Sequence, residues 1–127
     1  MAKVFVLVSD LFFQTRIQEA ARALGVSLET FSSGPALLER ACAESPALLI
    51  VDLNATSAQP VETIAALKAN ASLHVIPVVA YLSHVQVELE RAARQAGTDS
   101  VLPRSKFTRE LPELLRRYAL ETAKEKP

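Results

Sequence analysis

Short apolar runs rich in β-branched residues alternate along the chain with longer stretches in which apolar residues recur every three or four positions. The short runs predict β-strands, and the longer stretches predict amphipathic helices. The predicted strands cover residues 3–9, 26–31, 47–53, 75–81 and 99–102. Strands that alternate with helices are typical of a parallel sheet covered by helices on both faces.

The helical stretches carry start and stop signals. Phe13 and Ile17 fall on one face of the first predicted helix, and Gly25 follows it as a left-handed terminator. A fifth helix is expected to begin near Thr108 and to accommodate Pro112 in or near its first turn. The remaining helices are predicted over residues 35–44, 60–70 and 85–96.

The composition of each strand predicts its place in the sheet. The first, third and fourth strands are almost wholly apolar, as central parallel strands are, whereas the second alternates and the fifth ends at Pro103, which cannot donate a ladder hydrogen bond. With right-handed crossovers, we expect strand order 2-1-3-4-5 in an α/β three-layer sandwich, the (βα)5 arrangement called flavodoxin-like. Residues 1–120 form this one domain, and the tail 121–127 is expected to fray because it has nothing to bury.

Composition and charge exclude several classes of protein. The 127 residues include 14 Lys plus Arg and 14 Asp plus Glu, so the basic excess that marks nucleic-acid or anionic-membrane binding is missing. One cysteine excludes an internal disulfide. The apolar run 4–8 is too short for a signal-peptide core or a membrane span, so we expect a cytoplasmic protein.

Polar residues follow the predicted strands at one edge of the sheet. Asp10 follows the first strand, Asp52 and Asn54 follow the third, Ser83 follows the fourth, and Arg104 follows the fifth. Ligand chemistry in open parallel sheets gathers at this carboxyl edge. Two carboxylates about 4 Å apart would repel each other by about 1 to 4 kcal/mol, so a counter-charge is needed, either Mg²⁺ or an arginine paired with Asp52. Asp10 is alternatively a cap of the first helix.

The chain resembles the receiver domain of two-component response regulators over essentially its whole length. The resemblance is carried by residues 51–54 (Val-Asp-Leu-Asn), 76–79 (Ile-Pro-Val-Val) and 96–102 (Ala-Gly-Thr-Asp-Ser-Val-Leu). It implies that Asp52 is the phosphate acceptor, and that Asp10, Asp52 and the backbone carbonyl of Asn54 hold Mg²⁺. It also implies that Arg104, standing where the family has a lysine, is the charge partner of the phosphoryl group.

Other positions depart from the family pattern. Ser9 stands in place of the first of two acidic residues, and Leu82 stands in place of a Thr or Ser hydroxyl, with Ser83 one residue late. Val101 stands in place of the aromatic ring that reports phosphorylation. The resemblance therefore implies a scaffold with a degenerate phosphorylation site, a pseudo-receiver.

The departures favour a signalling module, not an enzyme, that acts in phosphorelay signal transduction mainly through protein–protein binding. Its expected partner is a histidine kinase or an output protein, and a homodimer is a further possibility. An exposed Val87 among arginines is the predicted interface, formed with Arg91, Arg94, Arg116 and Arg117.

Two alternatives stay open at this point. The first is a phosphorylation-competent receiver that accepts a phosphoryl group on Asp52 with Mg²⁺. The second is a small-molecule carrier of the same fold, which is disfavoured because no Gly-rich loop follows the first strand.

Overall fold

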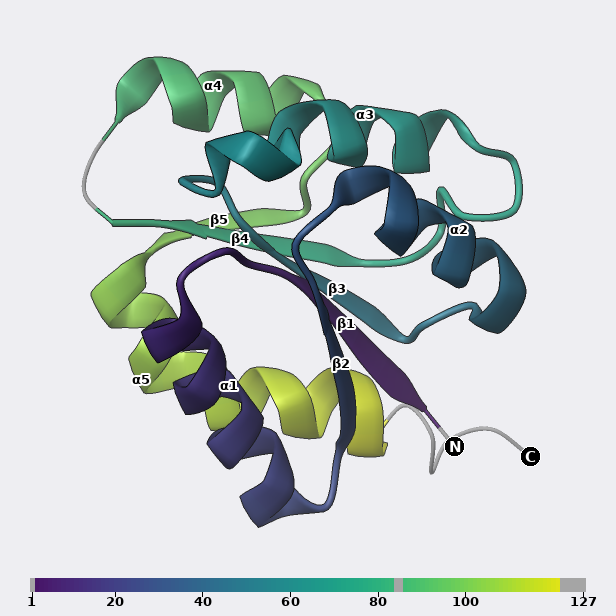
Figure 1. Ribbon diagram of the computed structural model, residues 1–127. Coiled ribbons are helices and arrows are strands. Elements are labelled where there is room, and N and C mark those ends of the chain that lie inside the picture. Colours follow the sequence, from purple (N-terminus) through teal and green to yellow (C-terminus); the bar gives the residue numbers. More distant parts are fainter. Residues whose placement is uncertain (1, 84–85, 122–127) are drawn as a thin grey trace.

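The apolar runs form strands, and the stretches of helical period pack on both sides of them (Figure 1). The computed structural model describes residues 2–83 and 86–121. The strands are β1 (Lys3–Leu7), β2 (Ser27–Phe31), β3 (Leu48–Asp52), β4 (Val78–Leu82) and β5 (Ser100–Pro103). The helices are α1 (Leu11–Leu24), α2 (Gly34–Glu44), α3 (Pro60–Ala69), α4 (Val87–Gln95) and α5 (Arg104–Leu115), with a 3₁₀ turn at Thr56–Ala58 and a π-helix at Arg116–Glu121.

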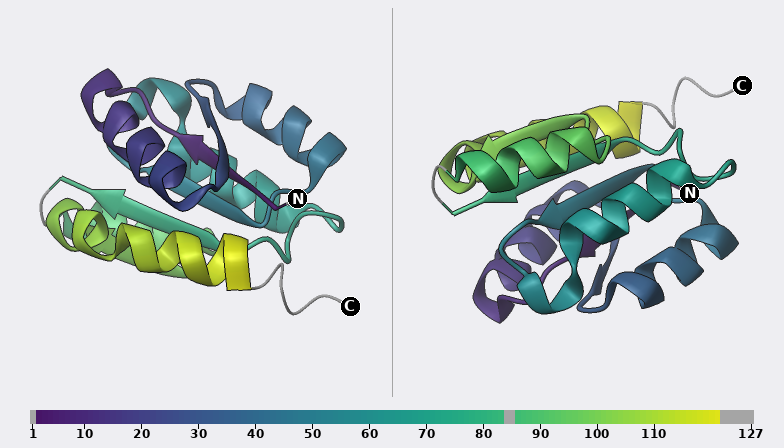
Figure 2. Two further views of the ribbon diagram at one scale, coloured as in Figure 1. Left: turned by 90° about the horizontal axis from the view of Figure 1, so that it is seen from below. Right: turned by 90° about the horizontal axis from the view of Figure 1, so that it is seen from above.

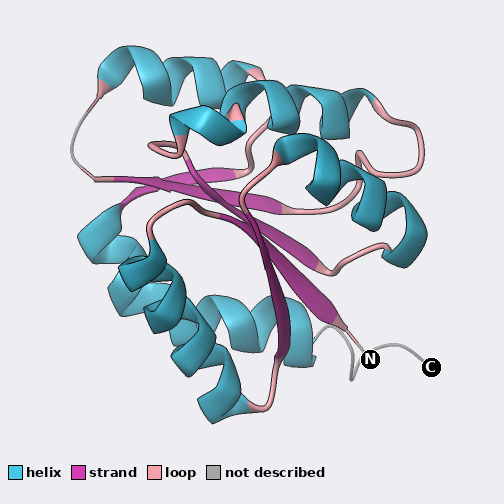
Figure 3. Cartoon of the chain, in the orientation of Figure 1, coloured by secondary structure: helices cyan, strands magenta, loops and turns pink. Residues whose placement is uncertain are grey.

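The sheet is parallel, with strand order β2-β1-β3-β4-β5, which confirms the predicted topology. Helices α1 and α5 cover one face, and α2, α3 and α4 cover the other (Figure 1). Seen from below, α1 and α5 lie in front of the sheet, and seen from above, α3 and α4 lie in front of it (Figure 2). Short loops join most elements (Figure 3). None of the described helices is long and apolar enough to cross a membrane.

The central strands contribute side chains to two separate cores. On β1, Val4 and Val6 enter the core under α1 and α5, whereas Phe5 and Leu7 enter the core under α2, α3 and α4. Both sets are fully buried. Successive residues of a strand point to opposite faces, so a strand covered on both sides must be apolar throughout. This explains why β1, β3 and β4 lack the alternation seen in β2.

Two helices meet so closely at Gly34 that no side chain fits there. A Cβ atom added to Gly34, the first residue of α2, would lie 2.1 Å from the Thr63 hydroxyl of α3 and 2.9 Å from the Ala58 carbonyl oxygen. The glycine thus sets the spacing between α2 and α3.

Two of the predicted starts were wrong by three residues or more. Strand β4 begins at Val78, three residues later than expected, because residues 70–76 form turns in which the amides of Leu73 and His74 bond the carbonyl of Asn70. Helix α5 begins at Arg104 and contains Pro112 in its interior, because buried Phe107 extends the apolar stripe one turn before Leu111. Residue 85, the predicted start of α4, and residues 122–127 of the predicted tail lie outside the described part of the chain.

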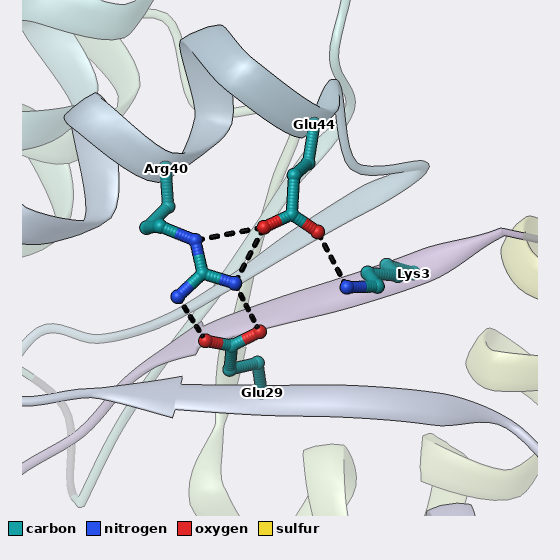
Figure 4. Close-up of polar contacts among 4 residues, drawn as sticks. All are labelled: Lys3, Glu29, Arg40 and Glu44. Carbon is teal, nitrogen blue, oxygen red and sulfur yellow. Dashed lines mark hydrogen bonds and ion pairs between the residues drawn. The ribbon is translucent and has the colours of Figure 1, made fainter.

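Charged side chains fasten the edge strand β2 to the rest of the domain (Figure 4). The Arg40 guanidinium of α2 donates from Nη1 to Glu29 of β2 at 2.6 Å and from Nε to Glu44 at 2.7 Å. Glu44 also pairs with Lys3 of β1. These bonds lower the pKa of Glu44 below its usual value. The network joins β1, β2 and α2 through charges that alternate in sign.

Candidate functional site

The carboxyl ends of β1, β3, β4 and β5 meet at one edge of the sheet, at the left of Figure 1. This edge brings Asp10, Asp52 and Arg104 within electrostatic range of one another. Ser83 lines the same pocket as Asp10 and Arg104. The expected convergence of two carboxylates and one cation therefore holds.

Asp52 is the last residue of β3, and its residue surface is only 2% exposed. Its Oδ1 accepts a hydrogen bond of 2.9 Å from the backbone N–H of Asn54. Burial raises the pKa of Asp52 above its usual value, and the Asp10 charge adds to the rise, while the Asn54 amide and Arg104 oppose it. The ionised form of Asp52 is therefore less stable here than that of an aspartate in water.

Asp10 caps helix α1, the alternative role that its position suggested. Its backbone is extended, and its Oδ1 accepts from the amides of Phe12 at 2.9 Å and Phe13 at 3.2 Å. These amides are donors that a helix start leaves without an intrahelical partner. One oxygen of the carboxylate is therefore engaged in holding the helix start.

Arg104, the first residue of α5, pairs with Asp10 and not with Asp52 as the sequence suggested. Its Nη2 lies 3.9 Å from Asp10 Oδ2, and its Cζ lies 4.8 Å from the centre of the Phe13 ring, a cation–π distance. The Phe13 ring draws the guanidinium toward α1. Its Nε is buried and has no hydrogen-bond partner in the described part of the chain.

The positions that depart from the family pattern are either apolar and buried or exposed. Leu82 is buried in the core under α2, α3 and α4, and Val101 lies in the same core. Ser9 and Ser83 are exposed. The backbone N–H of Ser83 donates to Asn54 Oδ1 at 2.7 Å, and Asn54 Nδ2 donates to Gln86 Oε1 at 2.8 Å. Asn54 therefore ties the end of β3 to the segment that leads into α4.

Tyr81 is a part of the site that sequence reasoning missed. It is fully buried beside Asp52 in the sheet register, stacked on Phe107 at 4.5 Å between ring centres and tilted against Phe13 at 5.0 Å. Its hydroxyl has no hydrogen-bond partner among the described residues, and burial raises its pKa. The available signal was a tyrosine inside an otherwise aliphatic strand.

The residues at this edge fit a magnesium ion poorly. The donors would be the carboxylates of Asp10 and Asp52 and the backbone carbonyl of Asn54. Asp10 already accepts hydrogen bonds from two amides and pairs with Arg104. The positive charge of Arg104 thus lies where the charge of a metal ion would otherwise balance the carboxylate. Within residues 2–83 and 86–121, no three His, Cys, Asp or Glu side chains are grouped so as to hold a metal. Two carboxylates, a backbone carbonyl and waters are a ligand set that Mg²⁺ accepts, and here Arg104 would compete with the ion for Asp10.

The predicted interface residues fall in two different layers. Val87 is 59% exposed on α4, where it lines a shallow pocket with Arg91 and Arg94. Arg116 and Arg117 are exposed on the π-helix that continues α5, in the layer on the other side of the sheet. The five residues therefore come from two segments that lie on opposite sides of the edge strand β5.

The α4 arginines are paired within their own helix. Arg91 pairs with Glu88 at 3.3 Å, and Arg94 pairs with Glu90 at 3.0 Å. Exposed pairs of this kind contribute little to stability and are readily exchanged for other partners.

The chain is similar in structure to solved response regulators. A response regulator from Hahella chejuensis superposes with a TM-score of 0.84 at 17% identity, covering 95% of this chain and 97% of that chain. The phosphorylated cyanobacterial phytochrome response regulator RcpA gives a TM-score of 0.81 at 19% identity, covering 95% of both chains. The receiver domain of the sensor histidine kinase PA1611 from Pseudomonas aeruginosa, which has a magnesium ion coordinated in its active site cleft, gives 0.81 at 17% identity and covers 92% of this chain and 96% of that chain. No protein-family model matches the sequence, and no curated protein matches it.

Proposed function

Because the chain has the fold of response-regulator receiver domains, we propose that it is a receiver-like signalling module that works by binding another protein and not by phosphorylation. The observation that carries this proposal is the replacement of phosphoryl contacts by internal ones. Asp10 and Arg104 are paired with each other, and Leu82 is turned into the core.

The chemistry of phosphoryl acceptance is disfavoured at Asp52 for three reasons. Attack on a phosphodonor needs an ionised carboxylate and a cation that spreads the developing negative charge. Burial raises the pKa of Asp52, and the cation beside it is held by Asp10 and the Phe13 ring. The Leu82 side chain also has no group that donates to a phosphoryl oxygen.

The face of α4 that carries Val87 is the proposed binding surface. An exposed valine rimmed by Arg91 and Arg94 offers an apolar contact surrounded by cations, which suits a partner with an apolar residue among acidic ones. We propose that this partner is a signalling protein, a histidine kinase or an output protein, met in the cytoplasm.

The first experiment is incubation with acetyl phosphate and Mg²⁺, followed by intact-mass measurement. The expected spectra show only the unmodified mass, both for the wild-type chain and for the Asp52→Asn variant. A phosphoryl adduct that forms on the wild-type chain and is lost in Asp52→Asn contradicts the proposal and establishes the alternative, a phosphorylation-competent receiver.

The second experiment tests the surface with matched exposed valines. Val87→Glu is compared with Val75→Glu, which changes a valine that is 74% exposed in the loop before β4. Proteins captured from the source cells by the wild type and by Val75→Glu are expected to be lost with Val87→Glu. An identical captured set for all three chains would remove α4 from the proposal.

A further inference from the structure

The pocket that Asp10, Ser83 and Arg104 line in the candidate site extends between the first turns of α1 and α5. It has a volume of ≈ 580 Å³, which is within the range of small-molecule sites. Three lining residues come from each helix, and in each helix two of them are spaced four apart: Phe12 and Arg16 in α1, and Arg104 and Thr108 in α5. Residues four apart on a helix are surface neighbours, so each helix presents a guanidinium beside a second lining side chain.

The polar groups of the pocket have more donors than acceptors. Arg16 is exposed and forms no ion pair with any residue in the described ranges. Arg104 Nε is buried without a hydrogen-bond partner in those ranges. The carboxylate in the lining is Asp10, which is engaged by the start of α1 and by Arg104. The Thr108 hydroxyl donates to the Arg104 carbonyl. A ligand that pairs with the exposed Arg16 guanidinium must accept hydrogen bonds and carry negative charge.

The apolar groups of the pocket indicate what the anion is attached to. Phe12 is 82% exposed, although its neighbour Phe13 is buried and forms part of the pocket wall. An exposed phenylalanine at the rim of a pocket offers a ring face to an apolar or aromatic group. Guanidinium groups match the planar fork of a carboxylate better than an ammonium would.

We propose that this pocket binds a small organic carboxylate, with the carboxylate held by Arg16 and Arg104 and an apolar or aromatic group against Phe12. The site is separate from the α4 surface that the proposed function uses, and it shares Asp10, Ser83 and Arg104 with the candidate site. An acidic side chain of a partner protein carries the same chemistry. The volume of the pocket, which matches that of small-molecule sites, favours a free small molecule as its source.

The test is a titration of the ¹⁵N-labelled chain with phenylacetate, followed by amide chemical shifts. Phenylacetamide, which has the same ring and no charge, is the ligand control. Arg16→Gln is the test variant, and Arg22→Gln, at the other end of α1, is the matched control variant. A ligand of this size should bind with a dissociation constant on the order of 1 mM.

We expect saturable shifts at α1 and the start of α5 with phenylacetate and none with phenylacetamide. Arg16→Gln should weaken binding about tenfold, the usual effect of losing one charge-assisted hydrogen bond, and Arg22→Gln should leave it unchanged. Equal shifts with both ligands, no saturation at about 20 mM, or equal losses in the two variants would overturn the proposal. Tighter binding of a capped Phe–Glu dipeptide than of phenylacetate would overturn the assignment to a small molecule.

Discussion

Replacing Tyr81 by phenylalanine should make this protein more stable. Tyr81 buries its hydroxyl completely, and that hydroxyl has no hydrogen-bond partner in the described part of the structure. Phenylalanine keeps the ring and therefore the contacts with Phe107 at 4.5 Å and with Phe13 at 5.0 Å. The substitution removes only the hydroxyl, which loses its hydrogen bonds to water on folding and forms none in their place.

The size of the effect follows from the cost of burying an unsatisfied hydroxyl, about 1 to 3 kcal/mol. Relaxation around the smaller side chain reduces the gain, so we expect the free energy of unfolding to rise by about 1 to 2 kcal/mol. For a chain of this length, each kcal/mol changes the melting temperature by roughly 3 to 5 °C. The assay is thermal unfolding followed by circular dichroism, together with urea unfolding to obtain the free energy.

Tyr118→Phe is the matched control, because Tyr118 lies only partly buried on the π-helix at the end of α5. It should leave the melting temperature nearly unchanged. A melting temperature of Tyr81→Phe at or below that of the wild type would refute the reasoning. Such a result would mean that the Tyr81 hydroxyl makes a hydrogen bond in solution, and that losing this bond costs more than the burial of the hydroxyl does.

Four further substitutions test other features. Gly34→Ala should lower the free energy of unfolding by about 1 to 3 kcal/mol in urea, since its Cβ would meet the Thr63 hydroxyl at 2.1 Å; Gly25→Ala, with open space but a φ of 71°, should cost about 1 kcal/mol. Asp52→Asn should raise the melting temperature at neutral pH, because burial raises the pKa of Asp52 and penalises its ionised form. That gain should shrink as the pH falls through the raised pKa toward the usual value, where the wild-type carboxyl is protonated; a gain independent of pH would contradict this account. Arg40→Ala should lower the melting temperature more in low salt than at about 1 M NaCl, and an equal loss in both would show that its ion pairs are not the cause.

The sheet and its order could be predicted because burial on both faces leaves a direct trace in the sequence, as the apolar run of β3 shows. The start of α5 could not, because Pro112 suggested a first turn, whereas the burial of Phe107 decided the outcome. The convergence at the carboxyl edge followed from topology. The ion-pair partner of Arg104 did not follow from topology, because it depends on the cation–π contact with Phe13 in the α1–α5 layer. Such a contact depends on the direction in which two side chains point, and it leaves no repeating pattern in the sequence.

The side chain of Asn54 has a consequence for how substitutions here will behave. A primary amide both donates and accepts, and Asn54 uses the two ends on Gln86 and on the Ser83 amide. Aspartate would keep only the acceptor, and leucine would keep neither. Asn54, two positions after Asp52, therefore couples the end of β3 to the start of α4. Local unfolding of either segment should destabilise the other.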